Sequence, residues 1–382
     1  MRCVHSILFA LLATIACSSE PKNGSGQNEA AGGSTNAGGG AQTGGKGPGA
    51  TGTSVTQTGG AGTGATGTGG GSNASQVGKI GGCTIFPADN PWNQDVSKLQ
   101  LHASSATYIS NMNPSRGMHP DWGNASTDFY GIPFSSGTGA TPQPLTWTES
   151  WGATESDTNP CPTGGNQFCY PIPLTAPIEG GPGADTGADR HVLYIDTAGA
   201  PNNCTLYELY MAQNPVGSSG WTAANGAIFH LGSNALRTDG WTSADAAGLP
   251  VLPGLVRYEE VMAGEITHAI RFTMNTTCQG YIHPATHYAS NSSCTTKPPM
   301  GLRLRLKASY DTSAASGPSL VILTAMKKYG IILADNGSDW YITGESNDGW
   351  TDYMDNLLSN LGKVHGSDFE VVDTGPISTA GS

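Results

Sequence analysis

Apolar and polar residues alternate most clearly at positions 301–307, GLRLRLK. In an extended strand the three leucines fall on one side, and Arg303, Arg305 and Lys307 fall on the other. The leucines are therefore expected to face a core and the cations to face outward. On a solvated surface the cations would pair with acids, whereas in a groove they would bind an anionic ligand such as a uronic-acid polymer.

Other short apolar runs also predict strands, because they are rich in β-branched and aromatic residues and are bounded by Gly, Pro and Asn. These runs cover residues 191–196, 205–212, 226–231, 266–273 and 281–288. Residues 331–343 predict two further strands, joined as a hairpin by the Asn336-Gly337 turn.

Helical patterns are fewer and short. They predict helices at residues 106–111, 255–262, 319–329 and 351–361. Gly264, Gly330 and Gly362 end three of them. Because many short strands accompany few helices, the sequence predicts a mainly β protein: an antiparallel β-sandwich-like single domain with a few short peripheral helices. An α+β domain is the alternative.

The first eighty residues have a different pattern. Residues 1–16 combine Arg2 with an apolar run too short to span a bilayer, which is typical of an export signal. The run TIAC, ending at Cys17, resembles a bacterial lipobox and predicts lipidation of that cysteine; the alternative is an ordinary secretory signal. Residues 17–80 are rich in Gly, Ser and Thr and predict a disordered tether. The globular domain is expected at 81–376, and a disordered tail at 377–382.

Six cysteines fall in the predicted domain: Cys83, Cys161, Cys169, Cys204, Cys278 and Cys294. An even number in an exported chain predicts three disulfides, for which fifteen pairings are possible. Short loops favour the pairs 161 with 169 and 278 with 294, which leaves 83 for 204. No closely spaced cysteine pair faces a second one, so a zinc site is not favoured.

Charge narrows the list of partners. The chain has 17 Lys and Arg against 29 Asp and Glu, a formal net charge of −12. Such a surface repels nucleic acid and anionic lipid, so we expect neither as a partner, and membrane contact only through the N-terminal lipid. The export signal predicts an outer-membrane or cell-surface lipoprotein, alternatively a secreted protein, and a monomer in either case.

Carboxylates are the main candidates for chemistry. Glycoside hydrolysis needs an acid and a base or nucleophile on either side of the sugar bond, and Glu208, Asp245 and Asp335 are candidates, with His287 assisting. Glu208 falls on an apolar strand face, where a carboxylate is either paired or functional. Capping is the structural alternative for Asp245, and turn formation for Asp335.

Substrate contacts can be assigned by residue type. Trp241 and Trp340 are candidates for stacking on sugar rings, and Arg257 and His268 for polar contacts. Arg190 would bind a substrate carboxylate or form a salt bridge with a loop acid. Residues 119–134 gather aromatic side chains in a loop broken by Gly and Pro, which would either bind sugar or cover the edge of the core.

Three histidines allow another interpretation. His268, His283 and His287 could meet on neighbouring strands and bind a metal, but no HExxH signature occurs, so ordinary hydrogen-bonded histidines are favoured. No GxSxG motif occurs, and the cysteines are assigned to bridges, so a serine or cysteine nucleophile is not expected. The sequence predicts no cofactor.

Three runs carry a resemblance: WTSADAAGLPVLPGLVRYEEV (241–261), KKYGIILADNGSDWYITG (327–344) and GSDFEVVD (366–373). In them the chain resembles a family of exported bacterial proteins, lipoproteins among them. The resemblance extends over about residues 189–373. No established activity accompanies the family, so the resemblance implies no catalytic residues.

Together these patterns predict an exported, surface-tethered enzyme that acts on carbohydrate. A polysaccharide hydrolase is favoured, or a lyase if the cationic strand faces the groove. One alternative is a non-catalytic lipoprotein that binds carbohydrate or the cell surface, and another is a metal-dependent hydrolase that uses the histidines. The partner is accordingly a polysaccharide or a cell-surface glycan.

Overall fold

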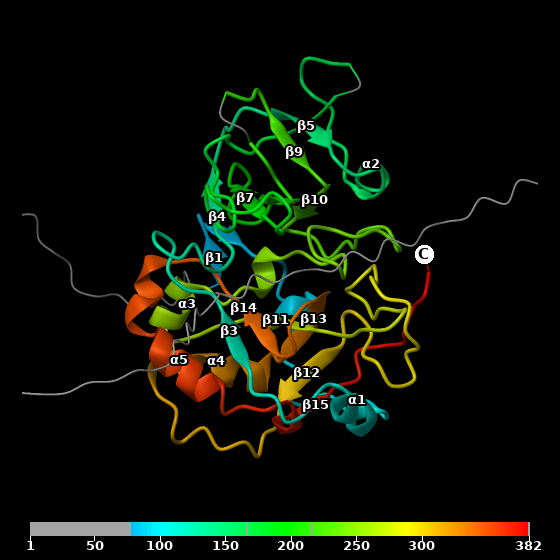
Figure 1. The fold of residues 1–382 in the computed structure, drawn as a ribbon, viewed down its shortest axis with the longest axis vertical. Helices are drawn as coiled ribbons and strands as arrows, with labels where there is room; N and C mark the ends of the chain where they lie inside the picture. Colours follow the sequence, from blue (N-terminus) through cyan, green and yellow to red (C-terminus); the bar gives the residue numbers. More distant parts are fainter. Residues whose placement is uncertain (1–77, 166, 215–216, 381–382) are drawn as a thin grey trace, which may run out of the picture. The chain divides into compact units, whose positions relative to one another are not determined.

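Four β-sheets organise the computed structural model, which describes residues 78–165, 167–214 and 217–380 (Figure 1). The described residues belong to one compact unit. The predicted signal, Cys17 and the tether as far as residue 77 lie outside the described residues. Within the described part of the chain, no helix has the length and apolar character needed to cross a membrane.

The largest sheet has six strands and is the centre of the fold. Its order is β15 (Phe369–Val371), β12 (Arg303–Leu306), β13 (Ile331–Asn336), β11 (Ile270–Met274), β14 (Tyr341–Thr343) and β3 (His119–Asp121). A four-stranded sheet has the order β10 (Asn225–His230), β8 (Thr205–Tyr210), β7 (Val192–Asp196) and β4 (Phe134–Gly137). A three-stranded sheet contains β6 (Phe168–Tyr170), β5 (Gln143–Trp147) and β9 (Trp221–Ala223), and β1 (Lys79–Ile80) pairs with β2 (Cys83–Thr84).

Helices are short. The α-helices are α1 (Ser105–Asn111), α2 (Gly152–Glu155), α3 (Tyr258–Ala263), α4 (Gly317–Lys328) and α5 (Met354–Leu361). The 3-10 turns are η2 (Pro91–Asn93), η3 (Leu252–Gly254), η4 (Asp348–Asp352) and η5 (Gly366–Asp368). Figure 1 shows α3, α4 and α5 together beside the six-stranded sheet. The predicted helices are confirmed with small shifts of their ends, and Gly264, in the left-handed region, ends α3 as expected.

The sheets are mixed, so the prediction of purely antiparallel strands is wrong. Parallel pairs occur in all three larger sheets: β11 with β13, β14 with β3, β4 with β7 and β5 with β9. Several mixed sheets with short helices make the protein mainly β or α+β. The structure does not show a sandwich of two antiparallel sheets.

Strand β11 explains why the predicted hairpin at Asn336-Gly337 is also wrong. Strands β13 and β14 do not pair with each other, because β11 lies between them and pairs with both. The backbone amides of Gly337 and Trp340 donate to carbonyls of β11. The turn therefore passes over the end of a third strand, whose apolar residues Ile270, Phe272 and Met274 are buried.

Two further expectations fail for local reasons: the strand at 281–288, and the exposure of Arg303 on β12. The segment 281–288 makes a turn closed by a hydrogen bond from Ala285 N to Ile282 O, and Pro284 has no amide to donate. Arg303, predicted to face solvent, is buried and donates to the carbonyls of Tyr329 and Pro91 at 2.8 Å each. Burial lowers the pKa of Arg303 to about 9. The chain that precedes α1 covers this side of β12.

The core lies on both faces of the four-stranded sheet. Leu193, Ile195 and Leu206 face a large cluster shared with the six-stranded sheet. Val192 and Leu209 face a second cluster, shared with the three-stranded sheet. Alternate residues of each strand point to opposite faces, so a sheet covered on both sides has few polar positions. This explains why β7 is buried almost throughout.

Both ends of the predicted domain are longer than expected. β1 begins at Lys79, before the expected boundary at residue 81. Residues 377–380, expected to be a disordered tail, are held by backbone hydrogen bonds that Ser378 and Tyr281 exchange at 2.7 and 2.9 Å.

All three predicted disulfides are confirmed: Cys83–Cys204, Cys161–Cys169 and Cys278–Cys294. Three disulfides are typical of a protein that works outside the cytoplasm.

Removing the Cys83–Cys204 bridge should lower the free energy of unfolding more than removing Cys161–Cys169. The cysteines are 121 and 8 residues apart, respectively, and loop-closure entropy makes the expected difference about 2 kcal/mol. All four side chains are buried, so the paired alanine variants lose similar packing. Urea denaturation measures both losses, and equal losses would show that the long loop is already restrained in the unfolded chain.

Candidate functional site

Arg271 on β11 is a charged residue in the middle of a buried strand. Asp335 on β13 lies opposite Thr273, and Thr343 on β14 follows Ile342, the residue opposite Phe272. Directly opposite residues share a face of the sheet, and residues two apart on one strand do as well. The register therefore places Asp335 and Thr343 on the face to which Arg271 points.

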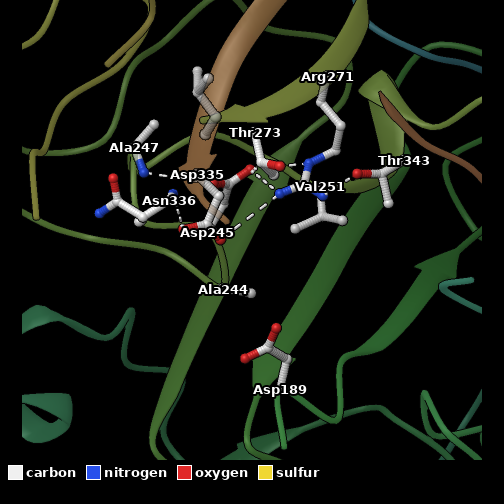
Figure 2. Close-up of polar contacts among 12 residues, drawn as sticks. Asp189, Ala244, Asp245, Ala247, Val251, Arg271, Thr273, Asp335, Asn336 and Thr343 are labelled. Carbon is white, nitrogen blue, oxygen red and sulfur yellow. Dashed lines mark hydrogen bonds and ion pairs between the residues drawn. The ribbon is translucent and has the colours of Figure 1, made fainter. Parts of the chain in front are cut away.

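Asp245 completes this set, which we call the Arg271 cluster: Arg271, Asp245, Asp335 and Thr343 (Figure 2). Arg271 Nη2 donates to Asp245 Oδ2 at 3.1 Å and lies 3.8 Å from Asp335 Oδ2. Its Nη1 donates to Thr343 Oγ1 at 2.8 Å. Asp245 comes from a turn, not a helix start, so its side chain has an ion-pairing role and does not cap a helix.

The two carboxylates of the cluster differ in exposure. The Asp245 side chain is fully buried, whereas 26% of the Asp335 side chain is exposed. Burial raises the pKa of Asp245, although Arg271 opposes this shift. Burial and then the Asp245 carboxylate raise the pKa of Asp335. One guanidinium cannot balance two carboxylates, so Asp335, at the edge of the cluster, is the carboxyl that retains a proton toward neutral pH.

His191, just before β7, lies next to this cluster. Its Nδ1 donates to Glu179 Oε2 at 2.7 Å, and its Nε2 donates to the carbonyl of Ala244 at 2.8 Å. Both partners are acceptors, so both ring nitrogens carry protons and the ring is an imidazolium. Burial alone would lower the pKa of His191, but the Glu179 carboxylate outweighs it and raises that pKa to about 10.

Asp189, two residues before His191 in the chain, faces the Arg271 cluster. It is exposed and accepts a hydrogen bond from Tyr210 Oη at 3.3 Å. Its charge contributes to the raised pKa of Asp335. Figure 2 shows Asp189 apart from the Arg271 cluster, with its carboxylate turned toward it.

The aromatic loop predicted at residues 119–134 divides into two parts. Trp122 is fully buried, whereas Tyr130 is exposed, and its hydroxyl donates to the Asp121 carboxylate. His119 Nε2 lies 3.3 Å from the same hydroxyl. Burial raises the pKa of Asp121, and Glu179 adds to that shift. This loop therefore adds a further acid close enough to interact with Glu179.

Among the predicted catalytic residues, the structure brings Asp245 and Asp335 together. His287 lies beside them, because its Nδ1 donates to the carbonyl of Ala246 at 2.7 Å. Glu208 does not join them at the surface: it is fully buried and accepts from the amides of Val251 and Leu252 at 2.9 to 3.0 Å. Burial raises the pKa of Glu208 to about 7. Its carboxylate holds the start of η3 and does not reach the surface.

The predicted substrate-binding residues are mostly internal. Trp340 is fully buried between Phe272 and Phe369, and its indole donates to Met112 O at 2.6 Å. Trp241 is half-buried, with the Arg237 guanidinium over its ring.

The three predicted polar contacts are internal as well. Arg257 and His268 are buried, and both pair with Glu260. Arg190 is also buried and donates to the carbonyls of Ala212 and Ala184.

The histidine cluster considered as an alternative does not form, and the three histidines are hydrogen-bonded separately, as favoured. His268 pairs with Glu260, His283 with Asp239, and His287 with a carbonyl oxygen. Within the described ranges, no group of three or more His, Cys, Asp or Glu side chains is arranged to hold a metal ion.

Sequence reasoning missed Arg271, His191, Glu179 and Asp189 as members of the site. One signal was available for Arg271, because HAIRFT places a charge inside an otherwise apolar strand. No family model, curated protein or solved structure matches the chain.

Replacing His191 with Gln should change how stability depends on pH. Because the folded-state pKa is raised from 6.5 to about 10, the stabilisation is complete below pH 6.5 and is lost as pH rises toward 10. We expect a loss of about 3 kcal/mol at pH 6, shrinking toward pH 10. Denaturant unfolding at both pH values measures it. His283→Gln, in an exposed pair with Asp239, is the control and should cost less than about 0.5 kcal/mol. A pH-independent loss would contradict the imidazolium assignment.

Replacing Arg271 with Met should destabilise the protein by about 3–5 kcal/mol, because Asp245 is left buried without a cation. Adding Asp245→Asn should recover part of that loss, since the uncompensated charge is then removed. Thermal and urea unfolding of the single and double variants test this. A double variant no more stable than Arg271→Met would mean that packing, and not charge, makes Arg271 necessary.

Proposed function

We propose that this protein hydrolyses a glycan, with Asp335 as the general acid and Asp189 as the second carboxyl group. The observation that carries the proposal is the partly exposed Asp335, whose pKa is raised by burial and by Asp245, facing an exposed carboxylate. Hydrolysis of a glycosidic bond requires two carboxyl groups, one of which donates a proton to the leaving oxygen.

The roles follow from the two environments. Asp335 would protonate the leaving oxygen of the sugar bond, and Asp189 would activate water or attack the anomeric carbon. Asp245 is shielded from substrate, so its role is to keep Asp335 protonated while Arg271 fixes both carboxylates. His287 holds the turn that carries Asp245. Tyr210 orients Asp189.

Charge around the site favours a hydrolase over a lyase of anionic polymers. Asp189 adds negative charge next to Asp335, and Glu179 adds negative charge next to Arg271, which disfavours a uronic-acid chain. The cations that would have favoured such a chain are engaged elsewhere: Arg303 with carbonyls, and Arg305 with Glu370 at 2.7 Å. A neutral polysaccharide suits the site better.

The proposed hydrolysis would take place outside the cytoplasm. The disulfides fit a protein outside the cytoplasm. A lipid on Cys17 with the tether after it would hold the enzyme at the cell surface; without the lipid it would be secreted.

One observation favours a second candidate, a non-catalytic glycan-binding protein. Asp245 and Arg271 satisfy each other inside the protein, and such a pair needs no substrate to explain it.

Replacing Asp335 with Asn should lower kcat/KM on a susceptible polysaccharide at least about 100-fold, because the proton donor is lost. For the wild type, activity should fall as pH rises through the raised pKa of Asp335, because the general acid is then deprotonated. Release of reducing ends from a panel of neutral and acidic polysaccharides measures both effects.

Asp352→Asn is the matched control for this experiment, since Asp352 is exposed in η4 and outside the site. It should retain full activity. Wild-type protein that releases no product from any polysaccharide, while still binding one, would favour the second candidate.

A further inference from the structure

A second surface feature lies where β5, β6 and α2 meet. It is an open groove of about 690 Å³, within the size range of ligand sites. Figure 1 shows α2 and β5 well away from β11 and β13, which carry Arg271 and Asp335. The groove is therefore separate from the acid pair.

Two aromatic rings line this groove. Phe168 lies directly opposite Leu145 across the pair of β5 and β6, so it shares a face with Leu145 and with Trp147, two residues further along β5. Trp147 and Phe168 are thus diagonal neighbours, close enough for aromatic side chains to act together. Both are half-buried, which leaves part of each at the groove.

The remaining lining is polar and carries little charge. Its exposed polar members are Thr146, Thr148, Glu149, Ser150 and Gln167. The indole nitrogen of Trp147 is buried at the wall and has no hydrogen-bond partner within the described residues. Sugar rings present apolar C–H faces to aromatic groups and hydroxyl groups to polar ones. A neutral sugar chain therefore matches both parts of the lining.

The two rings are held in place before any ligand binds. The Cys161–Cys169 disulfide fastens the residue after Phe168, and Asn159 Nδ2 donates to Cys169 O at 3.0 Å. Tyr170 contacts Trp147 edge-on, with ring centroids 6.3 Å apart. A rigid site loses less conformational entropy on binding.

We infer that this groove binds a segment of neutral polysaccharide and holds the polymer while the Asp335 site acts on it. The inference deepens the proposed hydrolysis and rests on it for the class of ligand and for the purpose of holding the polymer. Because the groove is open and Glu149 is the one charged residue that the structure describes in its lining, it does not select an anionic chain.

Binding is measured on the full chain carrying Asp335→Asn, so that hydrolysis does not remove the ligand. The probes are insoluble cellulose, chitin and β-1,3-glucan, with the free protein quantified after sedimentation. Ala153→Arg places a long side chain in the groove from an exposed position on α2. Thr154→Arg, the next residue of the same helix and also exposed, is absent from the groove lining and is the matched control.

We expect Ala153→Arg to weaken binding to the preferred polymer at least tenfold and Thr154→Arg to leave it unchanged. Equal binding by both variants, or no binding to any polymer by the parent protein, would overturn the inference. If binding depends on the groove but the wild type hydrolyses nothing, the groove is a binding site and the proposed hydrolysis is wrong. If Ala153→Arg hydrolyses insoluble polymer as fast as the wild type, the proposed hydrolysis is supported and the role of the groove is wrong.

Discussion

The buried guanidinium of Arg271 is the interaction on which the rest of the structure depends. A charge inside a strand must be paired, because its transfer from water otherwise costs several kcal/mol. Asp245 and Thr343 supply that pairing. Because Asp245 must stay paired with Arg271, the turn that carries Asp245 is held against the six-stranded sheet. The carbonyl of the neighbouring Ala244 accepts a hydrogen bond from the imidazolium of His191, which precedes a strand of the four-stranded sheet. A continuous polar path therefore connects the two sheets.

Glu208 holds the other end of the same segment. Its carboxylate extends from β8 and accepts from the amides of Val251 and Leu252. The chain from Asp245 to Leu252 is thus held by the guanidinium of one sheet and the carboxyl group of another. The amide of Ala247 in this segment also donates to the carbonyl of Ala334, the residue before Asp335. Buried charges have replaced regular secondary structure here, since the segment has neither helix nor strand before η3.

Local chemistry could be predicted from the sequence, and long-range placement could not. Glycine C-caps gave the helix ends, and loop lengths gave the disulfides. The Asn336-Gly337 hairpin failed because β11, some sixty residues earlier, enters between its strands. Asp245 and Asp335 were identified by residue type, but their meeting at Arg271 depends on that same insertion. Trp340 was predicted to stack on sugar but is buried in the core. Residue type alone does not distinguish a buried indole from one that contacts a ligand.

The order of strands in the six-stranded sheet determines when this sheet can form. Its strands span residues 119 to 371, and the edge strand β15 is the last to appear during synthesis. Pairing between such distant segments is slow to nucleate, since much chain entropy is lost before any contact is gained. The sheet cannot be completed until nearly all of the polypeptide is available. Until then the edge of β12 that β15 covers has no strand paired with it.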